Sequence, residues 1–433
     1  MTPSSPLIPP SMAAPSGAVA PGGAYAVAVA LVLALQFGPS LGLVGFVLHG
    51  SPAWALIGLA RDLIVAVLLL YGLHALLSSA RQQRLPASVR WALAFAIACL
   101  LLGLLAESNP LVAALNLRRL VFLPLLFVAL WLIPWTAVQI RALMRLVLVT
   151  CLAVAVIGLA ERLADETLWT QGLRIEAYAA SNPFDRFGWL PYHDSGRYFT
   201  WDLERWGLAP LRRMVSTYLE PTTLAAGLAA GFTLVLAERA RGRGSMLAWC
   251  LLGVCAAATF AKSFLLFVPL LLMWRALGWP GPAHVASLTL VAALSAAYAV
   301  AAGLRDGPFE HIEGLVTGLR FLTEGRWLGI GIGEAGNYAN ADTDIGAESG
   351  LGNALAQVGV VAFMLLAWVR TLAQEALARS AVDADPGGPW IASWLLFWLV
   401  SFLFSASSLG VGGNALGFAL LALYLHPNRA PWD

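Results

Sequence analysis

Charge is what this chain has least of. Charged residues make up 12% of its 433 residues, whereas a soluble protein carries about 25%. Hydrophobic residues make up 59%, and the mean hydropathy is +0.76. The formal net charge is only +2, without an extended basic run, which excludes the electrostatic footprint of a nucleic-acid-binding protein. We therefore expect an all-α polytopic membrane protein with no nucleic-acid partner.

Cysteine is also rare, and the usual signatures of metal and cofactor sites are missing. The four cysteines are Cys99, Cys151, Cys250 and Cys255. All of them lie in apolar segments, so we interpret them as small core residues and not as disulfides or metal ligands. No nucleophile elbow, phosphate-binding loop or dinucleotide fingerprint occurs in the sequence. The sequence therefore predicts neither a metal nor a cofactor.

Twelve apolar runs of spanning or near-spanning length predict transmembrane helices. They lie at about residues 24–48, 53–77, 91–105, 120–135, 146–164, 219–238, 246–261, 263–277, 283–303, 350–369, 390–407 and 409–425. The short basic connectors fall on one side of the membrane only if 246–277 is counted as two helices. Both termini are then cytoplasmic in a bacterial inner membrane. Residues 1–23 contain no Lys or Arg and five prolines before Gly17, which predicts a disordered inner tail and not a signal peptide.

This topology divides the remaining chain into membrane and periplasmic parts. We expect an N-terminal transmembrane bundle, a first large periplasmic loop, central transmembrane helices, a second periplasmic loop, and C-terminal transmembrane helices with a short cytoplasmic tail. The corresponding ranges are 24–164, 165–218, 219–303, 304–349 and 350–433. The first loop interleaves aromatic residues with arginines. It fits an aromatic cap at the lipid interface or a platform for sugars with arginines for phosphate, and these two interpretations are compatible.

The most unusual stretch runs from Trp327 to Phe363. Glycines alternate at its start, an Asn- and Asp-rich tract follows, and Glu348-Ser349-Gly350 precedes an apolar run. Alternating glycines favour backbone that turns sharply or lies close against a neighbour. Glu348 and Ser349 are typical of a helix start, where acidic and capping side chains complement free N–H groups. The pattern predicts a carboxylate at the mouth of a membrane helix, facing water.

Few other charged residues stand where chemistry would need them. Arg212 and Arg213 lie just before a helix that starts near Glu220-Pro221, where they could bind a pyrophosphate or anchor the helix at the interface. Lys262 is the only lysine, inside an apolar run; it is a functional candidate or a snorkelling residue at a hairpin tip. We interpret Arg61-Asp62 as a structural ion pair without chemistry.

Four segments in a fixed order resemble the O-antigen ligase / Wzy-type polysaccharide polymerase superfamily. They read RRMVSTYLEPTTLA, TFAKSFLLFVPLLL, LVTGLRFLTEGRWLGIGIGEAGNY and ESGLGNALAQVGVVAF. The resemblance covers about residues 205–365 in detail, and the N-terminal spans are similar only as membrane helices. It implies a metal-independent, inverting transferase that passes a glycan from an undecaprenyl-pyrophosphate donor to a sugar hydroxyl on the periplasmic side.

The resemblance also implies roles for individual residues. Arg212 or Arg213 would hold the pyrophosphate, with Lys262 in place of the family's usual arginine. Ligases of the family carry a histidine at the start of the helix after the second loop, and here Glu348 occupies that place. This departure favours an exopolysaccharide polymerase of the xanthan or succinoglycan type, with Glu348 as the catalytic residue. The predicted substrate-binding residues are Arg212, Arg213, Lys262, Glu220, Arg320 and Arg326.

Other classes of function remain open from the sequence. One alternative is a permease or a flippase for lipid-linked sugars, and another is ligase-like transfer to a different acceptor. A third is a non-catalytic subunit of an envelope glycan machine. For the polymerase we expect undecaprenyl-pyrophosphate-linked oligosaccharide and membrane lipids as partners, together with a chain-length-regulating co-polymerase and export machinery.

Overall fold

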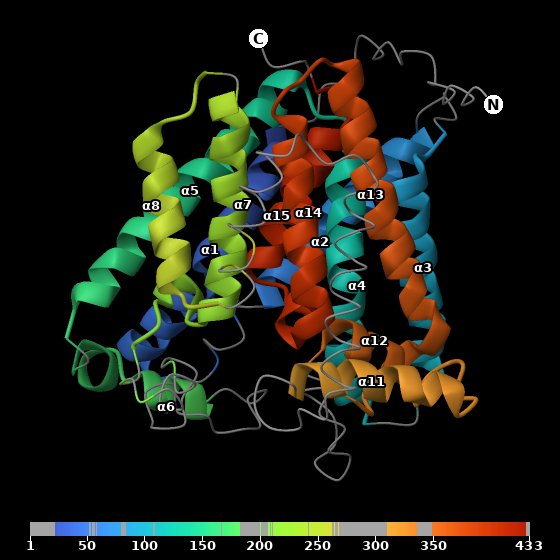
Figure 1. Ribbon diagram of the computed structural model, residues 1–433, viewed down its shortest axis with the longest axis horizontal. Coiled ribbons are helices and arrows are strands. Elements are labelled where there is room, and N and C mark those ends of the chain that lie inside the picture. The colour runs from blue at the N-terminus through green and yellow to red at the C-terminus, as the bar shows by residue number, and fades with distance from the viewer. Residues whose placement is uncertain are drawn as a thin grey trace.

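The protein forms a helical bundle in the computed structural model (Figure 1). The structure describes residues 22–51, 53, 57, 59–78, 84–106, 109–165, 167–181, 200, 207, 209, 211–240, 242–261, 264, 267, 310–335 and 349–429. Helices are the only regular elements in these residues. The expected all-α class is therefore confirmed for the described part of the chain.

Seven helical segments are long and apolar enough to cross a membrane. They are α1 (Gly22–His49), α2 (Leu59–Ser78), α3 (Ala87–Leu104), α4 (Pro110–Leu132), α5 (Ala137–Leu163), α7 (Pro221–Ala240) and the run from α12 (Gly350–Val358) through η5 (Gly359–Ala362) to α13 (Phe363–Val382). Three shorter apolar helices join them, α8 (Met246–Ala258), α14 (Gly388–Phe404) and α15 (Gly413–Leu425). Apolar helices of this number and length define a membrane-embedded protein.

Ten of the twelve predicted spans coincide with these helices. The other two, 263–277 and 283–303, lie outside the described residues except for Phe264 and Phe267, as does the predicted tail up to residue 21, so the twelve-span count stays a prediction. Two helices begin earlier than expected, α4 at Pro110 and α5 at Ala137. Arginines in their N-terminal halves (Arg118 and Arg119 in α4, Arg141 and Arg145 in α5) lower the local hydropathy, which hides these starts from a hydropathy scan.

Local capping explains where these two helices begin. The side chain of Asn109 accepts a hydrogen bond from the N–H of Leu111, and Pro110 occupies the first position of α4. Before α5, the Thr136 hydroxyl accepts from the N–H of Gln139 while the Gln139 side chain accepts from the N–H of Thr136. This reciprocal pair is a capping box, which satisfies two N–H groups that a helix start leaves free.

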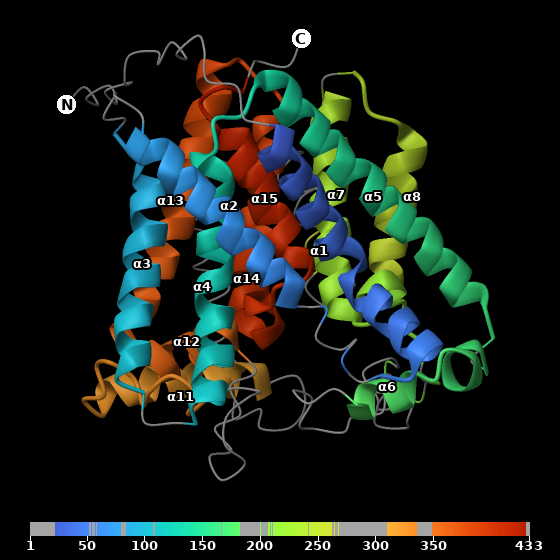
Figure 2. The same cartoon turned by 180° about the vertical axis from the view of Figure 1, so that it is seen from behind.

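The two ends of the bundle differ in what they hold (Figures 1 and 2). The end that carries Thr136, Asp383 and Arg429 is called the upper end here. The opposite, lower end carries α6 (Ile175–Ser181), α11 (Glu310–Thr323) and the starts of α7, α12 and α15. Helix α11 lies crosswise beneath the long helices (Figure 1). The described parts of both long polar segments therefore lie at the lower end.

Aromatic rings fill the centre of the bundle between α13, α14 and α15. Trp368 stacks on Phe418 with ring centroids 4.8 Å apart, and Trp394 meets Phe418 edge-on at 5.1 Å. Gly417 permits this packing, because a side chain there would overlap the indole of Trp394. Such offset and edge-to-face pairs stabilise by about 0.5–1.5 kcal/mol each beyond burial.

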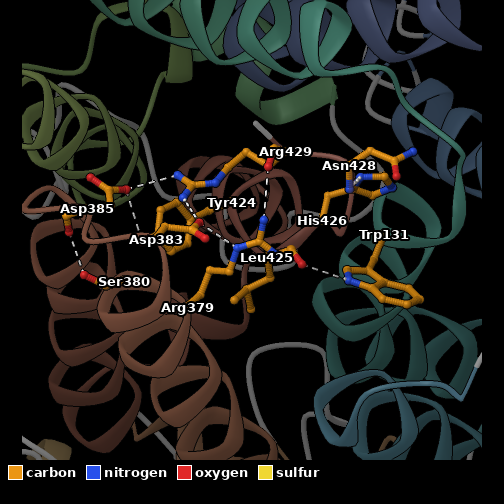
Figure 3. A network of polar contacts seen from close by, with 10 residues as sticks. All are labelled: Trp131, Arg379, Ser380, Asp383, Asp385, Tyr424, Leu425, His426, Asn428 and Arg429. Atoms are coloured by element: carbon orange, nitrogen blue, oxygen red, sulfur yellow. Dashed lines mark hydrogen bonds and ion pairs between the residues drawn. The ribbon is translucent and has the colours of Figure 1, made fainter. Parts of the chain in front are cut away.

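A network of charged residues closes the upper end (Figure 3). Arg429 is almost fully buried and pairs with Asp383 at 2.8 Å and Asp385 at 3.2 Å, while its guanidinium lies 4.1 Å from the Tyr424 ring. Arg379 pairs with Asp383 at 2.7 Å and donates to the carbonyl of Arg429. These contacts join the α13–α14 loop to the segment that follows α15.

His426 extends this network to the α4–α5 loop (Figure 3). Its Nε2 lies 2.9 Å from the carbonyl of Ile133, and its Nδ1 lies 3.1 Å from the N–H of Asn428. A carbonyl only accepts and an N–H only donates, so the ring is neutral with its proton on Nε2. Burial lowers the pKa of His426 to about 4, which is consistent with this neutral state.

Candidate functional site

Arg212 and Arg213 cap the ends of two helices at the lower end. The Arg212 Nη2 donates to the carbonyls of Glu161, Arg162 and Ala164 at 2.8–3.0 Å, at the end of α5. Nε of Arg213 donates to the carbonyl of Thr259 at 2.8 Å, at the end of α8. Cations complement the free carbonyls of a helix C-terminus. The structure thus gives both predicted pyrophosphate ligands a capping role, and their binding role stays a prediction.

A buried carboxylate, Glu161, accepts hydrogen bonds from the backbone that follows Arg213. Its Oε2 accepts from the N–H of Val215 at 3.2 Å and of Ser216 at 3.5 Å, and Oε1 lies 4.0 Å from Nη2 of Arg212. Oε1 is buried without a hydrogen-bond partner in the part of the chain that the structure describes. Sequence reasoning missed Glu161; the available signal was an acidic residue in the last turn of an apolar helix, where the helix dipole disfavours it.

The turn η4 (Ser216–Tyr218) is then fixed to α1 by a buried polar network. The Tyr218 hydroxyl donates to Gln36 Oε1 at 2.7 Å, and the Thr217 hydroxyl donates to the Gln36 carbonyl at 2.7 Å. Gln36 Nε2 donates to the Thr150 hydroxyl of α5 at 3.1 Å. Burial raises the pKa of Tyr218 well above its usual range, so its phenol stays protonated as a donor. Because each of these groups is almost fully buried, every missing partner would be costly.

Backbone strain collects in this part of the molecule. Ser216, Leu219 and Phe260 adopt φ values of 47°, 55° and 49°, which non-glycine residues rarely do. Each such residue costs of order 1–3 kcal/mol and persists only where its surroundings enforce it. Ser216 and Leu219 lie just before α7, and Phe260 lies just after α8. Together they mark this region as a candidate functional site.

Glu220 forms the N-terminal cap of α7. Its carboxylate accepts from the N–H groups of Thr222 at 3.1 Å and Thr223 at 2.5 Å, and from the Thr222 hydroxyl at 2.7 Å. Pro221 occupies the first helical position, as the sequence predicted. A carboxylate at this place complements the positive end of the helix dipole. The structure therefore assigns Glu220 a capping role, and its substrate contact stays a prediction.

The start of α12 is buried inside the lower end. The Ser349 side chain accepts from the N–H of Gly352 at 3.0 Å and donates to the carbonyl of Leu403 at 2.7 Å. A side chain at Gly350 would overlap Ser408 and Phe402. The predicted helix start with Ser349 as its cap is confirmed. Glu348 itself lies outside the described residues, but the chain enters this buried cap directly from it.

The starts of α7 and α15 touch each other beside this cap. Side chains at Gly412 and Gly413 would overlap Thr223, and one at Gly413 would also meet Gly227. Asn414, in the first turn of α15, donates to the carbonyl of Ser407 at 3.2 Å, while its buried Oδ1 has no partner among the described residues. The starts of α7 and α15 therefore touch at the lower end, and the start of α12 lies against η6 (Ala406–Leu409), which leads into α15. Free N–H groups and helix dipoles at helix starts favour negative charge.

The glycine-rich segment runs along α12 at very short range, as its pattern predicted. The N–H of Ile330 donates to the carbonyl of Ala356 at 2.7 Å, and the N–H of Val360 donates to the carbonyl of Trp327 at 2.9 Å. Gly329 and Gly359 have φ values of 80° and 56°, and a side chain at either would overlap the facing backbone. Only glycine combines these conformations with such close contact.

The Gln357 side chain ties this segment to the polar face of α12. Its Oε1 accepts from the N–H of Gly333 at 3.2 Å, and its Nε2 donates to Asn353 one turn earlier. Both side chains are almost fully buried. The pair explains why polar residues recur inside an otherwise apolar helix: they satisfy irregular backbone that would otherwise be buried without partners.

Arg320 lies in α11, which packs against the first turn of α12, and Arg326 lies just after α11. Arg320 is three-quarters exposed and pairs with Glu324 at 2.7 Å, and Arg326 lies over the Phe321 ring at 5.3 Å. Arg326 is next to Trp327, which contacts the far end of α12. Nine helical residues span about 13 Å, so Arg326 stands about that far from Ser349. The structure does not bring these two predicted ligands to Arg212, Arg213 and Glu220.

Lys262 lies outside the described residues, so its predicted role stays a prediction. Its neighbours Ala261 and Phe264 are buried, and Phe264 packs against Phe232 of α7 and Phe397 of α14. Thr259, which accepts from Arg213, stands three residues before it. The described residues on either side of it therefore lie in the interior of the bundle.

In residues 22–429, where the structure describes them, no three His, Cys, Asp or Glu side chains converge as a metal site. The chain also matches no known family model, no characterised protein and no solved structure. The resemblance to the polymerase superfamily therefore rests on the four sequence segments alone.

Proposed function

We propose that this protein polymerises undecaprenyl-pyrophosphate-linked oligosaccharide repeats into exopolysaccharide at the periplasmic face of the inner membrane. The observation that carries the proposal is that the starts of α7, α12 and α15 all lie at the lower end of a membrane-embedded bundle. Residues that approach this place include Glu220, Ser349 and Asn414. The glycine-rich segment and the capped turn with Arg212 and Arg213 border the same end.

This arrangement suits the chemistry of a lipid-pyrophosphate donor. The acceptor hydroxyl oxygen attacks the anomeric carbon, the bond from that carbon to the pyrophosphate oxygen breaks, and undecaprenyl pyrophosphate leaves. Helix N-termini and guanidiniums stabilise the charge that develops on the leaving group. Glu348 accepts the hydroxyl proton from the face opposite the leaving group, which gives inversion. No redox step or further reactant is needed.

The membrane setting is consistent with such a substrate. A polyprenyl chain stays in the bilayer while its pyrophosphate and glycan reach the aqueous face, so the site belongs at the end of the spans. The Gln36–Tyr218 hydrogen bond and the Ser349 cap fix the backbone before α7 and at the start of α12, both at this end. Catalysis by proximity and orientation requires that the groups that contact the substrate are held in place.

The test is the lipid-linked glycan pool of a deletion strain of the source bacterium. The proposal predicts single repeats accumulating on undecaprenyl pyrophosphate at the periplasmic face, with polymer restored by the wild-type gene. Loss of all periplasmic repeats, with repeats retained on the cytoplasmic face, would instead identify a flippase. Polymer of normal length that stays on undecaprenyl pyrophosphate and does not reach its acceptor would indicate a ligase-like transfer.

A further inference from the structure

Helix α11 is amphipathic and presents three different faces. Gly314 and Gly318, one turn apart, lie against the backbone of Gly352 at the start of α12, and a side chain at Gly318 or Gly352 would overlap the facing chain. A second face carries the exposed apolar side chains of Val316 and Leu319, which are three residues apart. The helix is therefore held to the bundle by its glycines and leaves apolar surface uncovered beside them.

The third face of α11 is polar. Glu313 and Arg320 are both exposed and stand about two turns apart. Arg320 pairs with Glu324, just after the helix, at 2.7 Å. The helix also lies crosswise beneath the long helices (Figure 1). A helix with one packed, one exposed apolar and one polar face, in this orientation, has the form of a helix at a membrane surface.

The chain that follows α11 adds two large apolar side chains to the same end. Trp327 and Leu328 are 61% and 58% exposed, although the backbone around them is fixed. The Trp327 carbonyl accepts from the N–H of Val360 at 2.9 Å, and the N–H of Gly329 donates to the carbonyl of Arg326 at 3.0 Å. Neighbouring apolar side chains that a fixed backbone leaves exposed indicate an interaction surface.

This surface adjoins the lipid-facing side of a spanning segment. Val360 of η5 and Phe363 at the start of α13 are also exposed, and both belong to the spanning run Gly350–Val382. Exposed apolar side chains of such a run face the acyl chains of the bilayer. Since the backbone of Trp327 is hydrogen-bonded to Val360, the exposed residues after α11 continue this surface at the lower end.

The charge beside these apolar residues fits the headgroup layer of a membrane. Arg326 is exposed, and its guanidinium lies 5.3 Å from the centre of the Phe321 ring. Tryptophan is enriched where the bilayer meets water. An arginine there can keep its aliphatic stem on apolar surface while its guanidinium stays at the polar level. The Arg326-Trp327 pair is therefore typical of the headgroup level.

We infer that α11 and residues 324–328 lie in the headgroup layer of the leaflet at the lower end and bind its phospholipid. Leu319, Trp327 and Leu328 contact acyl chains, and Arg326 donates to headgroup phosphates. The bilayer is the occupant because this surface is continuous with a span that the bilayer already covers. The inference does not depend on the proposed function, and it replaces the predicted substrate contact of Arg326.

The bilayer then sets the depth of the candidate functional site. The glycine face of α11 holds the start of α12, and Ser349 caps that start directly after Glu348. A helix of this kind stays at the headgroup level, so the start of α12 is held at that level as well. Lipid contact by α11 thus positions the helix start that Glu348 precedes.

Photocrosslinking of the full-length protein in nanodiscs of phosphatidylethanolamine and phosphatidylglycerol tests the inference. The photoreactive residue p-benzoylphenylalanine is introduced at Leu319, Leu328 or Glu313, and mass spectrometry measures lipid adducts after illumination. Adducts at Leu319 and Leu328 should be at least about 5-fold more frequent than at Glu313, which lies on the polar face. Leu70, an exposed residue of the span α2, is the positive control and should match Leu328.

Charge reversal tests the phosphate contact separately. Arg326→Glu should lower the adduct yield at Leu328 at least about 3-fold, because headgroup phosphates repel a carboxylate. Arg145→Glu, at an exposed arginine in the upper half of α5, is the matched control and should leave the yield unchanged. Size-exclusion chromatography checks that each variant is folded, and Arg326→Gln takes the place of Arg326→Glu if that variant is not.

Adducts at Leu319 and Leu328 no more frequent than at Glu313 would overturn the inference, because this surface would then lie in water. Crosslinks to a second protein chain in place of lipid would also overturn it, since protein would then cover the surface. An unchanged yield at Leu328 in the Arg326 variant would overturn the phosphate contact.

Discussion

The two ends of the bundle are built on opposite principles. At the upper end, Arg379 and Arg429 meet Asp383 and Asp385 in a closed set of ion pairs. At the lower end, Arg212 and Glu220 serve as helix caps. There, the buried oxygens Asn414 Oδ1 and Glu161 Oε1 have no hydrogen-bond partner among the described residues, whereas at the upper end only Arg429 Nε of this network lacks one among them.

The difference shows where the fold can accept a ligand. A set of charges that neutralise one another has little to offer a substrate and serves to lock loops together. Helix starts and polar atoms without hydrogen-bond partners can bind a ligand favourably, and strained turns are common at functional sites. The lower end is therefore the part to test for chemistry, and the upper end the part to test for stability.

Breaking the upper network should have the largest effect on folding. Arg429→Met leaves the buried carboxylate of Asp385 without its cation, and removal of one partner of a buried pair costs about 3–5 kcal/mol. Equilibrium unfolding in detergent measures this loss. Arg145→Met, an exposed arginine of α5, is the control and should stay within about 0.5 kcal/mol. Equal stability of both variants would show that the network is not a lock.

The next largest effect should come from the contact between Gly352 of α12 and Gly314 of α11. A methyl group at Gly352 would lie 2.1 Å from the carbonyl oxygen of Gly314 in α11, so Gly352→Ala must displace α11. Overpacking of this kind costs about 1–3 kcal/mol, and we expect polymer yield to fall with it. Gly38→Ala is the matched control, because no atom lies within 4 Å of a methyl group there. A wild-type yield from Gly352→Ala would separate α11 from the site.

The upper end should also respond to mild acid. His426 has an ordinary pKa of 6.5 and a folded-state pKa of about 4, so the unfolded chain takes up a proton that the folded one excludes. The contribution of neutral His426 to the free energy of unfolding is then complete above pH 6.5 and is lost as the pH falls towards 4. Between pH 7 and 5 the loss should be about 1–2 kcal/mol.

The charged groups near His426 do not themselves titrate between pH 7 and 5. The guanidinium of Arg379 further lowers the pKa of His426. Arg379 and Arg429 hold the pKa of Asp383 below its usual 3.8, so Asp383 loses its contribution only at lower pH. His426→Gln, which keeps a donor for the Ile133 carbonyl, should flatten the dependence between pH 7 and 5. If the stability of that variant falls as steeply between pH 7 and 5 as that of the wild type, a group other than His426 causes the acid response.

The smallest effect on stability should come from Arg320→Ala. Arg320 is three-quarters exposed and pairs only one turn away with Glu324, a contact that contributes about 0.3–0.5 kcal/mol. Unfolding should therefore be nearly unchanged. A large loss of polymer at unchanged stability would confirm that Arg320 contacts the glycan, and normal yield would remove it from the predicted substrate-binding set.

Periodicity and local rules predicted most of the helices and two details of the site. Apolar runs located ten spans, alternating glycines indicated the close contact of Gly329 with α12, and Ser349 was identified as a cap. These features depend on residues near one another in the sequence. The resemblance added the proposed chemistry, which the structure neither shows nor contradicts.

Contacts between distant residues could not be predicted in this way. No local pattern indicates that Arg212 reaches the carbonyls of Glu161 and Ala164, or that Asp62 pairs with Arg118. An arginine before a helix is equally suited to a phosphate and to the end of another helix. Only the packing of the bundle decides between them.

The most direct test of the proposed site is polymerisation of purified lipid-linked repeat by Glu348→Gln. Glutamine keeps the size and hydrogen bonding of the side chain but cannot accept the proton of the acceptor hydroxyl. A helix-start charge contributes only about 0.3–1 kcal/mol of stability, whereas a general base contributes about 10²–10⁴ in rate. We predict a folded protein that makes almost no polymer, and activity within a few-fold of wild type would contradict the assignment of Glu348 as the base.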